Sequence, residues 1–295
     1  RADDAYALDT NNYISQIEPF SEIVDEVHSV GGLHPEWDLG YYCNLFKQTK
    51  KRFPSITIKA LTAVEIKHIS TISEESFEET IRQLKQSGLG SIPGGGAEIL
   101  VDSVRDKICK GKESSQEYLD IHGIAHTLGV PTNCTMLFGT VETPEERITH
   151  LDKLRCQQDK TGGFQCFVPY PFLPDSSRLP EAQLSSANEI LRMIAVSRLM
   201  LDNIPHIKAY RMNIGDELAE LAISAGADDI DGTVMQESIM HLAGSTAQLD
   251  FGIDELCRLV RRAGGDPIRR DTVYSKFKPI EIKSSPSIQR LSMAK

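Results

Sequence analysis

The stretch 91–99 reads Ser-Ile-Pro-Gly-Gly-Gly-Ala-Glu-Ile, and its glycines Gly94, Gly95 and Gly96 could bring bare backbone close to a ligand. An apolar segment precedes the stretch and a helical pattern follows it, so we expect a turn from a strand into a helix. The N–H groups of such a turn can approach an anionic ligand without obstruction by side chains. A tight turn needed only for packing is the alternative interpretation.

Two glutamates follow glycine turns. Glu98 comes directly after the first turn, and Glu142 comes just after Gly139, where another helix is expected. Each carboxylate could accept hydrogen bonds from ligand hydroxyls or an ammonium group, as carboxylates do beside glycine turns in nucleotide sites. Each could instead complement the positive N-terminus of its helix.

Lys208 and Arg211 flank the end of a predicted strand. Because side chains alternate along a strand, at least one of them should face a ligand. A cation there would pair with a carboxylate or phosphate, and a solvated surface charge is the alternative.

Histidines and cysteines give no metal-binding pattern. His122 and His126 have the spacing of two zinc ligands on a helix, but no glutamate lies between them to act as a base, and we expect them to pack. The six cysteines are scattered without a close pair, which is typical of reduced, buried thiols. We therefore predict that this chain itself supplies no metal ligands.

Strands and helices alternate along the chain, which indicates a parallel sheet in an α/β fold. Seven strands precede helices, and they start near Glu26, Ile56, Leu89, Asn133, Phe164, His206 and Asp228. This count is one short of a (βα)8 TIM-type barrel, so we expect the first strand upstream of Arg1 and the special turns at one mouth. An open doubly wound sheet is the alternative. We assign residues 1–275 to the barrel and 276–295 to a peripheral tail.

Composition and charge limit the function classes. The chain has 295 residues, of which 40% are hydrophobic and 25% charged, as expected for one large globular domain. Its net charge of −10 argues against a nucleic-acid or membrane surface, while a local basic pocket for a small acidic molecule stays possible. No apolar run is long enough to span a bilayer and no signal peptide is evident, so we expect a cytoplasmic enzyme.

Several sequence blocks, taken together, resemble the aminofutalosine synthase family, radical S-adenosylmethionine enzymes of the futalosine route to menaquinone. The resemblance covers roughly residues 3–274. The blocks are Gly-Gly-Leu-His-Pro at 31–35, Ile-Lys-Ala-Leu-Thr-Ala-Val-Glu-Ile at 58–66, Pro-Gly-Gly-Gly-Ala-Glu-Ile at 93–99, Thr-Met-Leu-Phe-Gly at 135–139, Gln-Asp-Lys-Thr-Gly-Gly-Phe at 158–164, Leu-Asp-Asn-Ile at 201–204, His-Ile-Lys-Ala-Tyr at 206–210 and Asp-Ile-Asp-Gly-Thr at 229–233. The sister family of dehypoxanthine futalosine cyclases shares the first and third blocks.

The resemblance implies a radical SAM barrel in which a 4Fe-4S cluster receives an electron from a donor and reductively cleaves S-adenosylmethionine. The resulting 5′-deoxyadenosyl radical would add to 3-[(1-carboxyvinyl)oxy]benzoate and give aminofutalosine, a transferase reaction. By matching motifs, Gly31 and Gly32 would meet the methionine amino group. Gly94, Gly95, Gly96 and Glu98 would lie against the cofactor, and Gly139 and Glu142 would border adenine. His34, Lys208 and Arg211 are our candidates for the carboxylates of the substrate.

One departure from the family pattern leaves alternatives open. The family's C-x-x-x-C-x-x-C motif follows its first strand, and this sequence contains no copy of it. Three thiolates are needed for a conventional cluster. Either the cluster segment lies upstream of Arg1, or this lineage has lost it and the barrel is catalytically silent. A cyclase-like activity is the other alternative.

Overall fold

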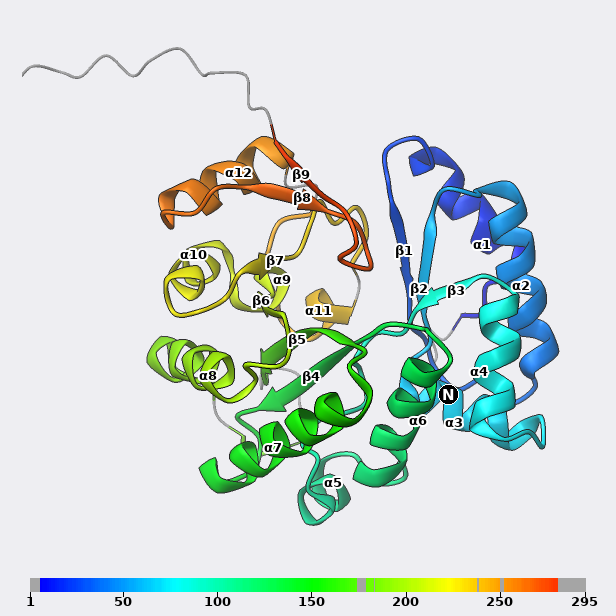
Figure 1. The fold of residues 1–295 in the computed structure, drawn as a ribbon, viewed down its shortest axis with the longest axis horizontal. Coiled ribbons are helices and arrows are strands. Elements are labelled where there is room, and N and C mark those ends of the chain that lie inside the picture. Colours follow the sequence, from blue (N-terminus) through cyan, green and yellow to red (C-terminus); the bar gives the residue numbers. More distant parts are fainter. Residues whose placement is uncertain (1–5, 174–178, 183, 238, 250–251, 281–295) are drawn as a thin grey trace, which may run out of the picture.

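The computed structural model describes residues 6–173, 179–182, 184–237, 239–249 and 252–280. Within them, seven parallel strands alternate with helices, as the sequence predicted (Figure 1). The strands are β1 (Glu26–Ser29), β2 (Thr57–Ala60), β3 (Leu89–Ser91), β4 (Thr132–Phe138), β5 (Phe164–Pro171), β6 (His206–Ala209) and β7 (Asp229–Ile230). The larger helices are α1 (Thr10–Ile17), α2 (Leu39–Arg52), α3 (Ala63–Ile72), α4 (Phe77–Gln86), α5 (Asp102–Ile108), α6 (Ser115–Thr127), α7 (Pro144–Thr161), α8 (Ala187–Met200), α10 (Asp216–Ser224) and α12 (Ile253–Arg262).

The order of the strands in space follows their order in the chain. One sheet runs β1-β2-β3 and a second runs β4-β5-β6-β7, with every neighbouring pair parallel. A bridge between Ile92 and Thr132 joins the two sheets. A doubly wound sheet reverses its strand order at a switch point, and this order has no reversal. The arrangement is that of a TIM-type barrel, and closure by an eighth strand stays a prediction.

Local sequence signals explain where the helices begin and end. Capping boxes start three of them, formed by Thr62, Ser114 and Thr143 with the glutamate three residues on. Helix α7 ends at Gly162, which has φ of 65°. Helix α5 is the first helix after the glycine stretch, where the sequence indicated a turn from a strand into a helix.

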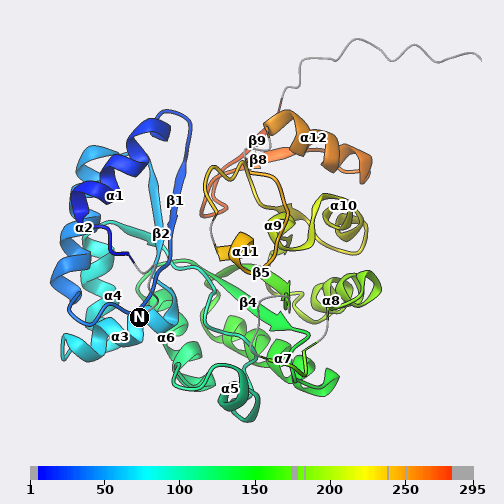
Figure 2. The same cartoon turned by 180° about the vertical axis from the view of Figure 1, so that it is seen from behind.

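The two faces of the sheet differ in chemistry. Ile58, Met136 and Phe138 point outward into the hydrophobic core beneath the helices, which surround the sheet in Figures 1 and 2. Since side chains alternate, the intervening residues point to the inner face. Those inner residues are largely polar: Glu26, His28, Lys59, Asn133, Thr135, Cys166, Lys208 and Asp229.

An antiparallel hairpin of β8 (Ile268–Arg270) and β9 (Phe277–Pro279) lies against the N-terminal ends of the strands. The Arg270 guanidinium binds Asp229 at 2.8 Å, and the hydroxyl of Tyr274, in the connection, donates to the same carboxylate at 2.7 Å. The boundary placed after residue 275 therefore falls inside this hairpin. Residues 281–295 of the predicted tail lie outside the described part.

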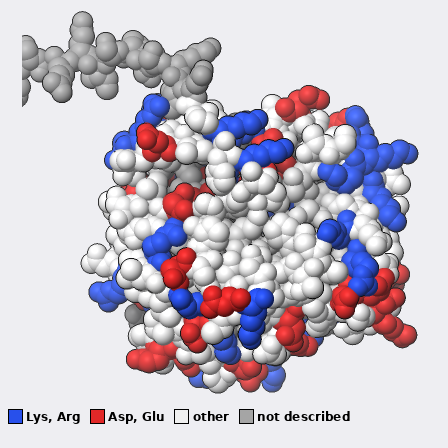
Figure 3. Space-filling model, in the orientation of Figure 1, with Lys and Arg blue, Asp and Glu red and all other residues white. Residues whose placement is uncertain are grey.

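Short 3-10 and α-helical segments complete the described chain: η1 (Glu18–Phe20), α9 (Arg211–Ile214) and α11 (Ile239–Leu242). Among the described helices, none combines the length and apolar character that a membrane crossing requires. On the face shown in Figure 3, charged side chains of both signs lie along the outline, and the centre carries few.

Candidate functional site

Contacts link the C-terminal ends of all seven strands into one continuous arc, from β1 to β7, which we call the mouth. The Gly31 N–H after β1 donates to Glu65 Oε1 at 3.0 Å, beyond β2. From there the links run through the turn after β3 to β4, β5, β6 and β7. They are Gly95 packing on Thr62, Leu137 N to Glu98 O at 2.9 Å, Phe172 N to Phe138 O at 2.8 Å, Asn213 Nδ2 to Pro171 O at 3.3 Å, and Arg211 N to Asp231 Oδ1 at 2.5 Å. Neighbouring turns therefore contact one another along the same edge of the strands, and their convergence on a single ligand site stays a prediction.

The first turn offers open backbone. Glu65 is buried and also accepts from the N–H and hydroxyl of Thr62, both at 2.8 Å, so it fixes Gly31 against the second turn. A Cβ placed on Gly32 would meet no described atom within 4 Å. The ring of His34 stacks on Trp37 with 4.2 Å between centroids. This turn can accept a small polar group beside Gly32.

Close packing requires the glycines after β3. A Cβ on Gly94 would lie 2.6 Å from Cys134 Cα, and one on Gly96 would lie 2.8 Å from Glu113 Oε1. The Gly94 carbonyl accepts hydrogen bonds from Thr135 Oγ1 at 2.7 Å and from the Tyr118 hydroxyl at 2.8 Å. The packing interpretation of these glycines thus has direct structural support, and contact with a cofactor stays a prediction.

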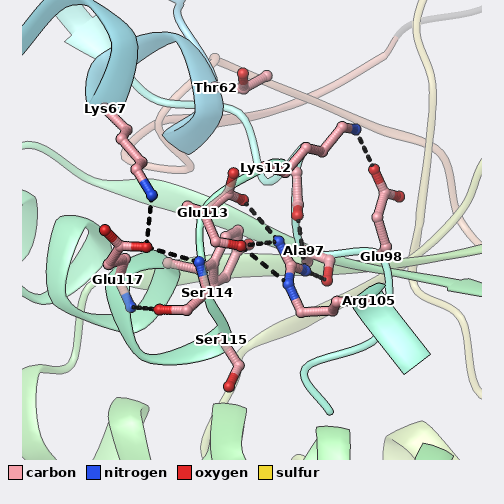
Figure 4. Close-up of polar contacts among 12 residues, drawn as sticks. Thr62, Lys67, Ala97, Glu98, Arg105, Lys112, Glu113, Ser114, Ser115 and Glu117 are labelled. Carbon is pink, nitrogen blue, oxygen red and sulfur yellow. Dashed lines mark hydrogen bonds and ion pairs between the residues drawn. The ribbon is translucent and has the colours of Figure 1, made fainter. Parts of the chain in front are cut away.

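Arg105 and Glu113 support this glycine turn from below (Figure 4). Arg105 donates to the carbonyls of Gly96, Ala97 and Glu113, and its guanidinium lies 3.2 Å from the Glu113 carboxylate. Both side chains are almost fully buried. Burial raises the pKa of Glu113 to about 7, and the Arg105 charge opposes that rise. Sequence reasoning missed this pair, because neither residue lies in a recognisable motif.

Glu98 sits at the mouth with a left-handed backbone, at φ of 42°. Its carboxylate binds Lys112 Nζ at 2.6 Å and remains 18% exposed (Figure 4). Since a carboxylate has several acceptor positions, Glu98 can accept further hydrogen bonds from a ligand.

Glu142 stabilises its own turn. Its carboxylate accepts from the N–H groups of Gly139 and Thr140 at 2.6 and 2.9 Å, and from Arg147 Nε at 2.8 Å. Burial alone would raise the pKa of Glu142, but the hydrogen bonds from Thr140 and Gly139, together with Arg147, lower it. The carboxylate already has protein donors, which favours a structural role.

The two other cation candidates already have anionic partners. Lys208 Nζ lies 2.8 Å from Asp229 Oδ2, on the inner face. Arg211 is fully buried, and its guanidinium lies 3.1 Å from Asp216 and 3.5 Å from Asp231. Arg211 thus holds β6 to β7 from inside the protein, away from the surface of the mouth.

Sequence reasoning missed two inner-face residues, Lys59 and Asn133. The Lys59 residue is 5% exposed, and its ammonium has no hydrogen bond or ion pair within the described chain. Asn133 is 6% exposed, and its Oδ1 also lacks a hydrogen-bond partner there. A signal was present for Lys59, which stands between the apolar, helix-facing residues Ile58 and Ala60.

The described residues do not form a metal or cluster site. No group of three His, Cys, Asp or Glu among them could hold a metal ion. The six cysteines are unpaired. His122 and His126 share Thr132 as a hydrogen-bond partner, and both rings contact Phe164. A 4Fe-4S cluster therefore does not fit the thiols within this part of the chain.

Comparison with known proteins gives relatives of several activities. Residues 161–283 match the family model described as the CofH/MqnC C-terminal region. Over 279 residues the chain is 40% identical to an aminodeoxyfutalosine synthase of Thermus thermophilus, covering 93% of this chain and 75% of that protein. It is 41% identical to a cyclic dehypoxanthine futalosine synthase of Streptomyces coelicolor, over 83% of this chain and 61% of that one. It is 36% identical to a 5-amino-6-(D-ribitylamino)uracil–L-tyrosine 4-hydroxyphenyl transferase of Methanothermobacter thermautotrophicus, with 94% and 77% covered.

A solved structure shares the fold. Methylornithine synthase (PylB) superposes with a TM-score of 0.67 at 18% identity, covering 90% of this chain and 75% of that one. At this level of identity the likeness shows the barrel-type fold alone.

Proposed function

This chain belongs to the aminodeoxyfutalosine synthase family of radical S-adenosylmethionine enzymes, and from that premise we propose that it transfers an adenosyl group to 3-[(1-carboxyvinyl)oxy]benzoate. The observation that carries the proposal is the linked arc of strand ends above a polar inner face. An ordinary barrel fills its interior with layers of Val, Ile and Leu. A barrel with Lys59, Asn133 and Lys208 inside is built to bind a polar molecule.

S-adenosylmethionine would supply the 5′-deoxyadenosyl group, once reduced by a 4Fe-4S cluster that the described residues do not hold. Open backbone at Gly31 and Gly32 fits its methionine amino end, and Glu98 has acceptor capacity for hydroxyl groups. Glu142 and Arg147 would keep Gly139 in place beside adenine. His34 stacks with Trp37 at the rim, where it could contact a carboxylate and limit water entry.

Inside the barrel, Asp229 forms ion pairs with both Lys208 and Arg270, so Lys208 would orient the substrate while it is held by its own carboxylate. Arg211 would position β6 and β7. These roles require a substrate small enough to pass between the turns at the mouth.

The test is a product assay on the full-length natural protein, reconstituted anaerobically with iron and sulfide. We expect 3-[(1-carboxyvinyl)oxy]benzoate, called the enol ether below, to react with S-adenosylmethionine and dithionite and give aminofutalosine, which mass spectrometry would detect. The alternatives predict other outcomes. Turnover of dehypoxanthine futalosine alone would assign the cyclase activity, and a colourless protein without turnover would indicate a silent barrel.

A further inference from the structure

Lys59 occupies an unusual position in the middle of β2. Its neighbours Ile58 and Ala60 belong to the core beneath the helices, so the Lys59 side chain points to the inner face. It pairs in register with His28 on β1 and Ser91 on β3. The aliphatic stem and the ammonium are both removed from bulk water, because the residue is only 5% exposed.

The ammonium of Lys59 lacks the direct partner that its neighbours have. Lys208 and Arg270 both bind Asp229, at 2.8 Å, whereas Lys59 makes no hydrogen bond or ion pair within the described residues. Burial lowers the pKa of Lys59, and the nearby Glu26 carboxylate opposes that change. A buried cation without a hydrogen bond is costly, and an anionic ligand that accepts hydrogen bonds from Lys59 would offset the cost that Glu26 leaves.

Asn133 lies on the same inner face, two strands along, and its buried Oδ1 also has no partner. Lys59 presents donors to an anionic ligand, whereas the Asn133 Oδ1 is an acceptor and would bind a hydroxyl or amino group instead. The surrounding carboxylates of Glu26 and Asp229 would repel a doubly charged phosphate group. A single carboxylate matches the single charge of Lys59 and can accept its hydrogen bonds.

We propose that Lys59 binds a carboxylate of the substrate inside the barrel. Lys208 and Arg211 are less suited to this role, because both already have anionic partners in the protein. This inference rests on the proposed function, because it concerns the same substrate. Lys59 would then be a specificity-determining residue, because it would favour binding of a carboxylic acid over binding of its neutral ester.

The experiment measures binding and turnover with the reconstituted full-length protein carrying Lys59→Met. This change keeps an unbranched side chain of nearly the same length and removes the charge. Calorimetry should show the enol ether binding about 10- to 100-fold more weakly, as expected for losing a charge-assisted hydrogen bond. Binding of S-adenosylmethionine should stay unchanged. Lys59→Arg should restore part of the affinity, and Lys47→Met, at an exposed position on α2, should behave as wild type.

Thermal unfolding without ligand distinguishes binding from a structural role. Because Lys59→Met removes an unpartnered buried charge, its Tm should equal or exceed that of wild type, whereas loss of a structural lysine would lower it. The methyl ester of the substrate should bind wild type and Lys59→Met equally. The role of Lys59 is overturned if wild type turns over the enol ether and Lys59→Met binds it equally well. It is also overturned if Lys59→Met fails to fold. Either result leaves the proposed function standing. Wild type that binds no carboxylic acid substrate overturns both.

Discussion

At the scale of single residues, Gly94 and Gly32 both lie in glycine-rich turns, but a side chain is excluded at only one of them. Gly94 is enclosed by the backbone of β4, whereas Gly32 faces open space. We expect Gly94→Ala to destabilise the protein by about 3 kcal/mol or more, because backbone atoms cannot yield to the new Cβ. Gly32→Ala should change stability by less than about 0.5 kcal/mol and weaken S-adenosylmethionine binding about tenfold. Urea unfolding and calorimetry would measure both. Equal stability losses in the two variants would contradict this account.

Glu113 makes the support of the glycine turn depend on pH. Its pKa is raised to about 7 in the folded protein, so the folded state keeps a proton that the unfolded chain has released. The stabilising contribution is therefore complete below the ordinary glutamate pKa and is lost as pH rises through about 7. We expect the Tm of wild type to fall between about pH 5 and pH 7.5 more than that of Glu113→Gln. Glu75→Gln, at an exposed position, should follow wild type. Parallel curves for wild type and Glu113→Gln would refute the assignment.

At the scale of elements, the β8–β9 hairpin is held by two Asp–Arg pairs of unequal burial. Asp229 and Arg270 are mostly buried, while Asp25 and Arg269 are more than half exposed. Asp229→Asn should cost about 3 kcal/mol, because it leaves Lys208 and Arg270 without their shared carboxylate. Asp25→Asn should cost less than about 1 kcal/mol, because water and salt screen that pair. Chemical denaturation checks the difference, and similar losses would show that the hairpin is not anchored through Asp229.

The elements also show what sequence could and could not predict. The seven strands were recognised because each couples an apolar run to a turn signal, and the linked turns follow from parallel strand order. Helix α3 begins in a capping box of Thr62 and Glu65, a local signal that our sequence analysis did not use. The partners of Arg211 and Glu142 could not be predicted, since burial and ion pairing arise only from packing. Lys59 was quoted within a motif, and its isolation became evident only in three dimensions.

At the scale of the whole molecule, the account requires that one mouth hold both the cofactor and the entrance to a polar interior. A competing location exists on the outside of the helical layer. There, a groove of about 470 Å³ runs between α4, α6 and α7 and includes Phe77, Leu119 and Gln157. Its lining offers no cation for an acidic substrate, as its charged residues are Glu78 and Asp120.

The most direct measurement is an anaerobic crystal structure of the reconstituted full-length protein with S-adenosylmethionine and the enol ether. We expect S-adenosylmethionine to lie beside Gly32 and Glu98, with the substrate beneath it and one carboxylate on Lys59. Ligand density in the outer groove, or an interior in which Lys59 contacts only protein, would contradict the account.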